Sequence, residues 1–306
     1  MKKYFVVIMA FMLYSTAYAE IVESSVKDSS VHEETIVAKD GDETYTTAIY
    51  TSNNSANEVH SSDSKWHEAT SAEAYYKETV VGSDGYNSSF EEKYANASDV
   101  VNGENKYVSS YMEGYMRDES EHNPETMRDT AVYESSKYIE NVSDMDGTYK
   151  EDIYGESTWK SSFSEPGYSE AINAQSIWDS DVTIAPDYYE SNLAKSSMYD
   201  ETVNEGGYES SYFESSDYKE HVADSDEAYV EDVYGQSILK TSVSENGDST
   251  AIYGESVHDS DVQISRNSWA SDLYKSNAYM EIVSSEDYES NVAHINTYEE
   301  SLAKNF

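Results

Sequence analysis

The sequence predicts a low-complexity repeat protein that is mostly disordered with short β-strands, or an extended repetitive β array of about ten residues per unit, rather than a conventional globular domain. Three observations predict this. The 306 residues carry a formal net charge of -42. Leu, Ile, Val and Phe together supply only 49 residues, so core-forming side chains are scarce for a chain so highly charged. Tyrosine, with 30 residues, recurs regularly through the second half of the chain.

The first 19 residues have the form of a secretory signal peptide. Two lysines precede an apolar run over residues 4–13, and the triplet Ala17-Tyr18-Ala19 has the small-x-small form of a cleavage site. We expect cleavage after Ala19 and a secreted, extracellular chain. The run is shorter than the roughly 20 apolar residues that span a bilayer, which argues against the alternative of an uncleaved anchor. No later segment approaches that length, so we expect no membrane association after cleavage. Losing two lysines and no acid would bring the net charge to -44.

The first half of the mature chain repeats only loosely. Residues 20–94 are interpreted as a diverged tyrosine-rich repeat region, in which Tyr45, Tyr76 and Tyr86 each have an apolar residue four positions later. Residues 95–132 lose this rhythm and contain Asn123-Pro124, a turn-forming pair. We therefore expect an irregular linker or a decayed repeat there.

The second half contains a tandem repeat. YESSKYIENVSDMDGTYKEDIYGES begins at Tyr133, and FESSDYKEHVADSDEAYVEDVYGQS begins at Phe213. Residues 133–212 form the first copy. Residues 213–302 form the second copy with an extra C-terminal unit, and 303–306 form a tail. Such a duplication predicts that one structure is built twice.

Each copy is built from a shorter unit, Tyr-x-Glu-x-Val followed by about five polar residues. Sixteen steps lead from Tyr138 to Tyr298, so the mean period is about ten residues. In a strand the first, third and fifth residues share a face, which predicts a meander of very short strands with Tyr stacked on Tyr between neighbours. A helix stays an alternative because three turns span about 11 residues, although Ser, Asn, Asp and Gly in every unit disfavour it.

The energy of one unit favours disorder. Ordering ten residues costs about 1–2 kcal/mol each in backbone entropy, whereas burying two apolar side chains contributes about 3–6 kcal/mol in total. The net charge adds self-repulsion. Stacked units could share their faces, as solenoid repeats do, so an ordered β array stays open as the second interpretation.

Motifs of enzymes and of metal sites are absent from the sequence. No glycine-rich phosphate loop, hydrolase motif or cysteine nucleophile occurs, so we expect no enzyme activity and no cofactor. The histidines are interpreted as solvated residues. Aspartate pairs such as Asp179/Asp181 and Asp259/Asp261 recur without the spacing of an EF-hand. Weak Ca²⁺ binding by many carboxylates and a merely solvated charged surface are both open. Nucleic acid is not expected as a partner because a polyanion repels phosphate.

Tyrosine provides the unusual chemical signal. The chain has no cysteine, so disulfides cannot stabilise a secreted product. Phenols flanked by acids suit oxidation to DOPA or dityrosine, and also sulfation, while packing alone is the simpler role. The candidate cross-linking or modified tyrosines are Tyr138, Tyr149, Tyr168, Tyr189, Tyr199, Tyr208, Tyr218, Tyr229, Tyr279, Tyr288 and Tyr298. Candidate N-glycosylation sites are Asn53, Asn87, Asn96 and Asn141.

The cysteine-free repeats of the YES, YKE and YGES type resemble tyrosine-rich eggshell precursors of the trematode vitelline protein B type. The resemblance covers most of residues 133–302. It implies a structural protein whose tyrosines are hydroxylated and cross-linked by a tyrosinase. Because the chain has only 19 Lys and Arg residues, coupling through tyrosine is expected rather than coupling of lysine to quinones.

Together these features predict a secreted acidic tyrosine-rich structural protein of an eggshell, extracellular matrix, silk or adhesive, cross-linked through tyrosine. Its expected partners are further copies of itself, other matrix proteins, and a tyrosinase or peroxidase that acts on it. The alternative is an acidic extracellular cation-binding or surface-interacting protein without a covalent assembly role.

Overall fold

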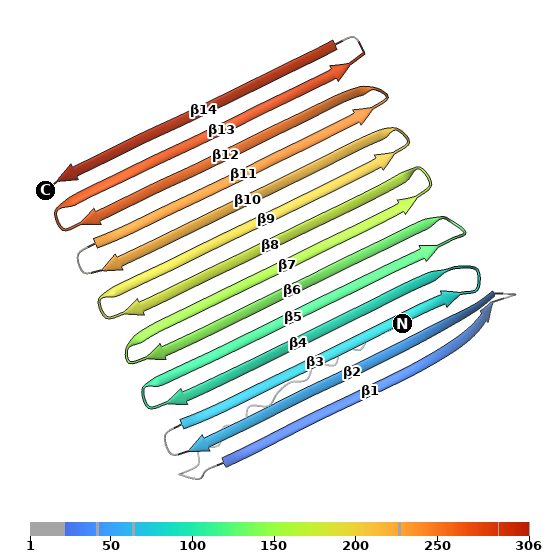
Figure 1. Ribbon diagram of the computed structural model, residues 1–306, viewed down its shortest axis with the longest axis horizontal. Coiled ribbons are helices and arrows are strands. Elements are labelled where there is room, and N and C mark those ends of the chain that lie inside the picture. Colours follow the sequence, from blue (N-terminus) through green and yellow to red (C-terminus); the bar gives the residue numbers. More distant parts are fainter. Residues whose placement is uncertain (1–21, 41–42, 63–64, 226–227, 287, 306) are drawn as a thin grey trace.

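The computed structural model describes residues 22–40, 43–62, 65–225, 228–286 and 288–305. Within these ranges the chain forms one fourteen-stranded sheet. Neighbouring strands are antiparallel and consecutive in sequence, so their order in space is their order in the chain (Figure 1). The predicted signal peptide and its cleavage site after Ala19 lie outside the described residues.

The strands are long and, from β6 onward, uniform in length. Each of β6 to β14 has 18 residues. The bounds are β1 Val22–Asp40, β2 Glu43–Ser62, β3 Lys65–Gly82, β4 Asn87–Gly103, β5 Lys106–Asn123, β6 Arg128–Met145, β7 Thr148–Glu165, β8 Tyr168–Ala185, β9 Tyr188–Glu205, β10 Tyr208–Ser225, β11 Ala228–Glu245, β12 Asp248–Ser265, β13 Ser268–Ser285 and β14 Tyr288–Asn305. From β6 to β14 the strands therefore begin at equal intervals along the sequence.

Two-residue turns set the register of these hairpins. At Asp146-Gly147 the φ angles are 51° and 82°, and at Asn246-Gly247 they are 52° and 95°. Two successive positive φ angles are the signature of the type I′ turn, whose twist matches that of the strands it joins. Asp-Gly and Asn-Gly are favoured there because both residues tolerate the left-handed region. Each such turn pairs the last residue of one strand with the first residue of the next, as Met145 pairs with Thr148.

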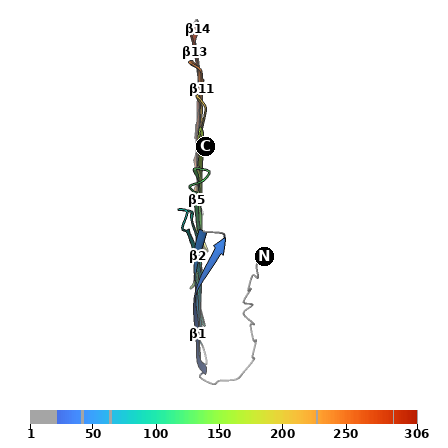
Figure 2. The ribbon, with the colours of Figure 1, turned by 90° about the vertical axis from the view of Figure 1, so that its right-hand side faces the viewer.

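The sheet is a single layer without a core. Seen edge-on, the described strands form one thin and nearly flat slab, from which the arrow end of β1 bends away (Figure 2). Among the described residues no hydrophobic side chain is buried. The same residues contain no helix that is long and apolar enough to cross a membrane. The order of the sheet therefore depends on backbone hydrogen bonds and on side chains that cover one another across strands.

The structure corrects the predicted fold. The prediction of a low-complexity, mostly disordered chain with short β-strands is wrong, since the described residues form long strands in one regular sheet. The alternative β array also needs correction, because each ten-residue unit is half a strand and not a short strand with its own turn. Disorder was inferred from the lack of core-forming residues, and this sheet is built without a core.

The segment predicted to be irregular follows the same plan. Residues 95–132 contribute to β4, β5 and β6, which pair in register with one another. Asn123-Pro124 lies at the β5–β6 connection, where the Asn123 side-chain oxygen accepts hydrogen bonds from the backbone N–H groups of Glu125 and Thr126 at 3.1 and 3.2 Å. The signal for a break thus marks a longer turn within the same sheet.

The turn geometry predicts that replacement by alanine destabilises the protein more at Gly247, in the turn after β11, than at Gly235, within β11. We expect Gly247→Ala to destabilise the β11–β12 hairpin by about 1 kcal/mol, because an L-residue at a φ of 95° is strained. Amide hydrogen exchange of β11 and β12 would show faster exchange in this variant. Gly235→Ala is the matched control within β11, since an added methyl group there meets its nearest atoms at an ordinary 3.9 Å. Equal exchange in the two variants would contradict the turn assignment.

Candidate functional site

The repeated tyrosines all lie on one face of the sheet. Paired residues on neighbouring strands of β6 to β14 always combine an odd with an even number, for example Tyr149 with Ile184 and Ile184 with Tyr189. Within a strand the repeat advances by ten residues, as from Tyr149 to Trp159. Across a turn it advances by nine or eleven, as from Trp159 to Tyr168. An advance of ten residues within a strand keeps the side chain on the same face, because successive side chains alternate between faces. Residues that share a face on neighbouring strands differ in parity, so an advance of nine or eleven residues across a turn keeps the tyrosine on that face.

We call this surface the tyrosine face. It carries all the tyrosines predicted as modification candidates, which are Tyr138, Tyr149, Tyr168, Tyr189, Tyr199, Tyr208, Tyr218, Tyr229, Tyr279, Tyr288 and Tyr298. The prediction placed each unit on a strand with its first, third and fifth residues together. The structure adds that successive units, led by a tyrosine or its replacement, present those residues to the same side.

Most of these tyrosines donate a hydrogen bond to the glutamate two residues along the strand. The Oη to Oε2 distances lie between 2.5 and 3.1 Å. Residues two apart in a strand lie on the same face, so the Tyr-x-Glu sequence brings phenol and carboxylate together without help from a neighbouring strand. Among the predicted candidates the donors are Tyr138, Tyr168, Tyr199, Tyr218, Tyr229, Tyr279 and Tyr298.

The carboxylate partners keep the phenols protonated. The hydrogen bond to Glu140 raises the pKa of Tyr138, with partial burial as the second cause. Partial burial, followed by the hydrogen bond to Glu78, raises the pKa of Tyr76 to about 12. The negative charge nearby disfavours the phenolate and the hydrogen bond favours the neutral donor, so both effects have the same sign.

A row of serines runs along the middle of the tyrosine face. Ser157 and Ser176 are directly paired, and their Oγ atoms lie 2.8 Å apart. Ser197 and Ser216 repeat this contact at 2.7 Å. The row separates two bands of aromatic and aliphatic side chains. Its in-register members from β6 to β12 are Ser136, Ser157, Ser176, Ser197, Ser216, Ser237 and Ser256.

Aromatic rings do not stack strand upon strand as expected. Antiparallel pairing places Tyr199 opposite Ala174 on one side and Glu214 on the other. Ring contacts instead run diagonally: the Tyr199 and Tyr212 centroids are 5.8 Å apart with the rings inclined at 69°. This is the edge-to-face geometry that aromatic pairs favour. Because the directly paired positions carry a small or an acidic side chain, part of the Tyr199 ring stays uncovered.

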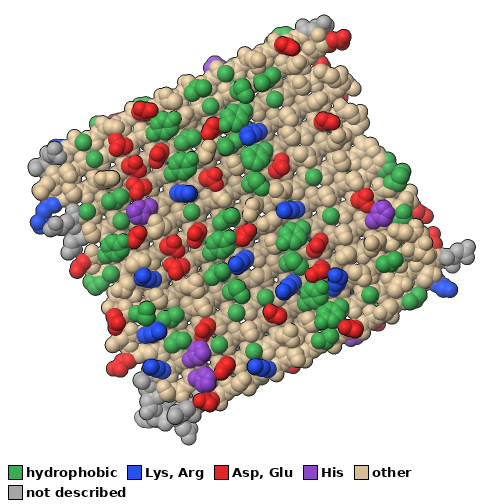
Figure 3. All heavy atoms as spheres, in the orientation of Figure 1, with side chains coloured by type: hydrophobic (Ala, Val, Ile, Leu, Met, Phe, Trp, Pro, Cys, Tyr) green, Lys and Arg blue, Asp and Glu red, His purple; other side chains and the backbone are tan. Residues whose placement is uncertain are grey.

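The opposite surface, which we call the aspartate face, carries a row of polar side chains in register. Asp152 pairs with Asp181, and Asp261 lies between Asp232 and Asp272. His221 lies in the same row, directly opposite Asp232, and its Nδ1 lies 2.9 Å from the Asp232 carboxylate. Figure 3 looks onto this face and shows acidic groups interspersed with separate apolar side chains rather than one continuous apolar patch.

Crowding makes two of these carboxyl groups less acidic. Partial burial and then Asp179 and Asp152 raise the pKa of Asp181. Partial burial, followed by the hydrogen bond with Asp232 and the charge of Asp259, raises the pKa of Asp261. A carboxyl with a raised pKa in the folded state opposes folding while it is ionised. At neutral pH these two carboxylates therefore lower the stability of the sheet.

A shallow depression of about 340 Å³ lies beside this row, where small Ala194 is found between longer side chains. Asp179, His221, Asp232 and Lys219 line it. Within the described residues no group of three or more His, Asp or Glu side chains is arranged to hold a metal ion.

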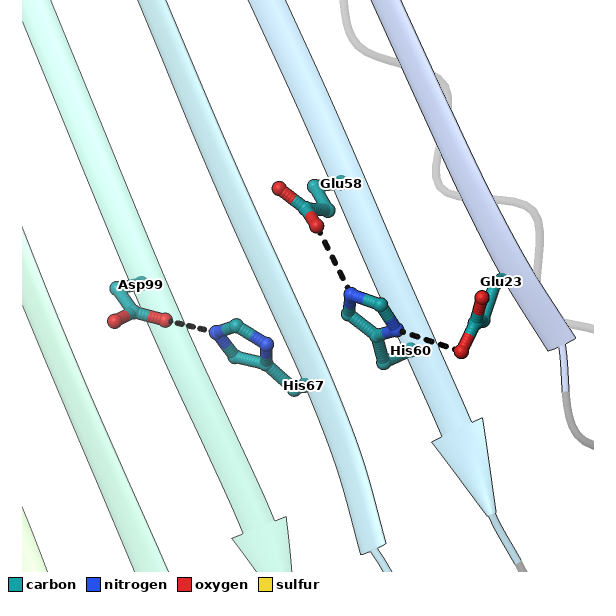
Figure 4. Close-up of polar contacts among 5 residues, drawn as sticks. All are labelled: Glu23, Glu58, His60, His67 and Asp99. Carbon is teal, nitrogen blue, oxygen red and sulfur yellow. Dashed lines mark hydrogen bonds and ion pairs between the residues drawn. The ribbon is translucent and has the colours of Figure 1, made fainter.

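Two of the histidines predicted to be solvated meet at the hairpin of β2 and β3. His60 pairs with His67, and their rings are parallel with centroids 6.0 Å apart (Figure 4). His60 Nε2 lies 2.9 Å from Glu58, and His67 Nε2 lies 2.8 Å from Asp99. The hydrogen bond with Glu58 raises the pKa of His60. Their symmetric placement about the hairpin is the sequence signal from which this pair could have been predicted.

The predicted glycosylation sites are all in strands. Asn53 lies in β2, Asn87 and Asn96 in β4, and Asn141 in β6. Asn96 is half-buried and donates a hydrogen bond to the Tyr94 hydroxyl at 3.1 Å, whereas the other three are exposed.

Comparison of the chain with protein-family models, with curated proteins and with solved structures finds no match.

The raised pKa values on the aspartate face predict a stabilising effect of acid. A group whose pKa is raised by folding contributes stability below its unfolded pKa of 3.8 and loses it as the pH rises through the folded value. In urea unfolding at pH 7 we expect Asp181→Asn and Asp261→Asn each to raise the free energy of unfolding by about 0.5 kcal/mol. Both variants should also gain less stability than the unaltered protein when the pH is lowered. Asp217→Asn is the control, because Asp217 pairs with Gln236 and Ser196. Equal effects at all three positions would contradict a role of the row.

The Tyr-x-Glu contact predicts the titration of Tyr76. Its pKa of about 12 should fall in Glu78→Gln but stay above the ordinary 10.0, because partial burial, the largest cause of the shift, remains while the hydrogen bond to the carboxylate and its charge are lost. Ultraviolet absorbance of the phenolate would detect this as earlier ionisation. The folded pKa is raised, so the contact stabilises the sheet below pH 10 and loses this effect as the pH rises toward 12. Glu73→Gln on the other face of β3 should leave the curve unchanged; an unchanged curve in Glu78→Gln would refute the contact.

Proposed function

We propose that the protein is a secreted acidic structural component of an eggshell, extracellular matrix, silk or adhesive, joined to further chains through its tyrosines. The observation that carries the proposal is the regular array of phenols on one face of a coreless sheet. A binding or catalytic protein concentrates its reactive groups in a concave site. Here equivalent groups recur from strand to strand, as a material that forms many identical bonds requires.

The hydrogen-bonded glutamates support oxidative coupling. When a phenol loses an electron it also loses its proton, and the carboxylate of Glu140 lies 2.8 Å from the Tyr138 hydroxyl, where it can accept that proton. Two phenoxyl radicals then form a carbon–carbon bond ortho to their hydroxyls. With peroxide as the oxidant, two tyrosines lose one hydrogen atom each and one peroxide is reduced to two waters. A peroxidase is the partner that this radical coupling needs. A tyrosinase would act by the other route, in which O₂ is reduced to water while the phenol is oxidised to an o-quinone that couples with a second phenol.

Exposure favours coupling between chains over coupling within one. Tyr288 and Tyr298 on β14 are 59% and 51% exposed, more than the tyrosines of inner strands. Disulfides cannot supply the cohesion instead, because the chain has no cysteine. Other matrix proteins with accessible phenols would be joined by the same reaction.

The aspartate row supports a second candidate function, a cation-binding or surface-interacting extracellular protein without covalent assembly. Its carboxylates are close enough to raise one another's pKa, so cations would relieve their repulsion. In that case the functional groups lie on the aspartate face, and tyrosine oxidation would be incidental.

Peroxidase treatment tests the leading proposal. We expect peroxidase and hydrogen peroxide to produce dityrosine fluorescence and covalent oligomers, and we expect Tyr288→Phe with Tyr298→Phe to remove most of the inter-chain product. Tyr188→Phe with Tyr253→Phe, on the aspartate face, is the matched control and should retain it. Native material whose tyrosines are all unmodified would refute the proposed function.

A further inference from the structure

The two edges of the sheet are open. Among the described strands, β1 and β14 each have one neighbour, so each leaves the hydrogen-bonding groups of one side without a strand to pair with. Strongly exposed hydrophobic side chains are also found there. Val26, Val31 and Val37 on β1 are 61–65% exposed, and Ile295 on β14 is 73% exposed. Exposed edges of this kind are templates for pairing with another chain.

The number of strands makes the two edges compatible with each other. Because fourteen is even, β14 is antiparallel to β1 (Figure 1). A second copy shifted within the plane of the sheet, without rotation, presents its β1 beside β14 in the antiparallel direction. It also keeps its tyrosine face on the same side. The alternation of strands then continues across the boundary as it does inside one chain.

Side-chain complementarity selects one register for this boundary. Keeping the tyrosine faces aligned allows only registers that differ by two residues. In one of them Val292 lies opposite Ile36, and Leu302 lies opposite Val26. The same register places Glu289 opposite Lys39.

The neighbouring registers are less favourable. The selected register has one apolar–acid pair, Ile295 with Glu33. A shift by two residues in one direction creates three such pairs, namely Val292 with Glu34, Val26 with Glu300 and Val37 with Glu289. A shift in the other direction creates two, Leu302 with Asp28 and Val31 with Glu299. Both shifts also separate Glu289 from Lys39.

Charge further favours β14 as the partner of β1. In the selected register His294 lies opposite Glu34, and one like-charged pair, Glu300 with Asp28, opposes association. If two β1 strands paired about a two-fold axis with Val26 opposite Ile36, Asp28 would face Glu34 twice. Like charges directly opposite are destabilising, so the β1–β1 register that pairs these apolar residues is disfavoured.

We propose that copies of this chain associate edge to edge, β14 of one with β1 of the next, in the register that pairs Glu289 with Lys39. The interface is heterologous, and a pure translation never closes, so the product is an open-ended ribbon one sheet thick. The net charge of -42 on each copy opposes this growth. Salt screens that repulsion, so association strengthens with ionic strength.

Charge reversal at the interface tests the proposal with full-length protein and no oxidant, so the result is independent of tyrosine coupling. At physiological ionic strength, sedimentation velocity should show a concentration-dependent series of oligomers, and electron microscopy should show ribbons. Lys39→Glu and Glu289→Lys should each weaken association roughly tenfold, because an attractive pair becomes a repulsive one. The double variant should restore it, since each interface then regains an opposite-charge pair.

Lys219→Glu, on inner strand β10, makes the same charge change as Lys39→Glu away from both edges and should associate like the unaltered protein. Circular dichroism would verify that every variant keeps its β signal. A protein that stays monomeric at all concentrations and salt levels would overturn the proposal, as would a dimer that grows no further. Single reversals that associate normally would overturn the register.

Discussion

Backbone pairing between neighbouring strands is the interaction on which everything else in this structure depends. A globular domain offsets the entropy of ordering its chain mainly by burying apolar side chains, but here none is buried among the described residues. The sheet relies on long, uninterrupted ladders that run the full length of β6 to β14. Each backbone hydrogen bond makes a net contribution of only about 1 kcal/mol to stability, so the ladders must be long and regular. The two-residue turns matter because they fix the register over the whole ladder.

Constant register explains the chemistry of both faces. It keeps the repeated tyrosines on one side, where Tyr-x-Glu contacts form within a strand, and it aligns aspartates of consecutive strands on the other side. A flat sheet of many strands is unusual unless stacking or side-chain ladders resist twist. The paired serines Ser157 and Ser176 are an example of such a ladder. The same regularity leaves reactive groups exposed and edges open, which suits a protein that becomes part of a larger material.

The sequence allowed the local geometry to be predicted but not the architecture. The alternation within Tyr-x-Glu-x-Val indicates which of its residues share a face of a strand. Averaging the repeat to ten residues concealed the steps of nine, ten and eleven, which distinguish residues within a strand from residues across a turn. Composition then pointed to disorder, because that argument assumes a core. The dipeptides Asp146-Gly147 and Asn246-Gly247 are hairpin signals that would have located two of the turns. The aspartate row and the His60–His67 pair could not be predicted without that register.

The pairing of odd-numbered with even-numbered residues across each turn also limits how such a chain can lengthen during evolution. A strand copied together with one turn adds an even number of residues, so the antiparallel direction continues but the inserted tyrosines emerge on the aspartate face. Copying two strands restores both direction and face. The smallest repeat that keeps both is thus a hairpin with its turns, and the observed duplication, which carries Tyr133 in β6 onto Phe213 in β10, contains two of them. Deleting a single residue within a strand would move the side chains of the rest of that strand to the opposite face, so this fold depends on the spacing of the sequence as well as on its composition.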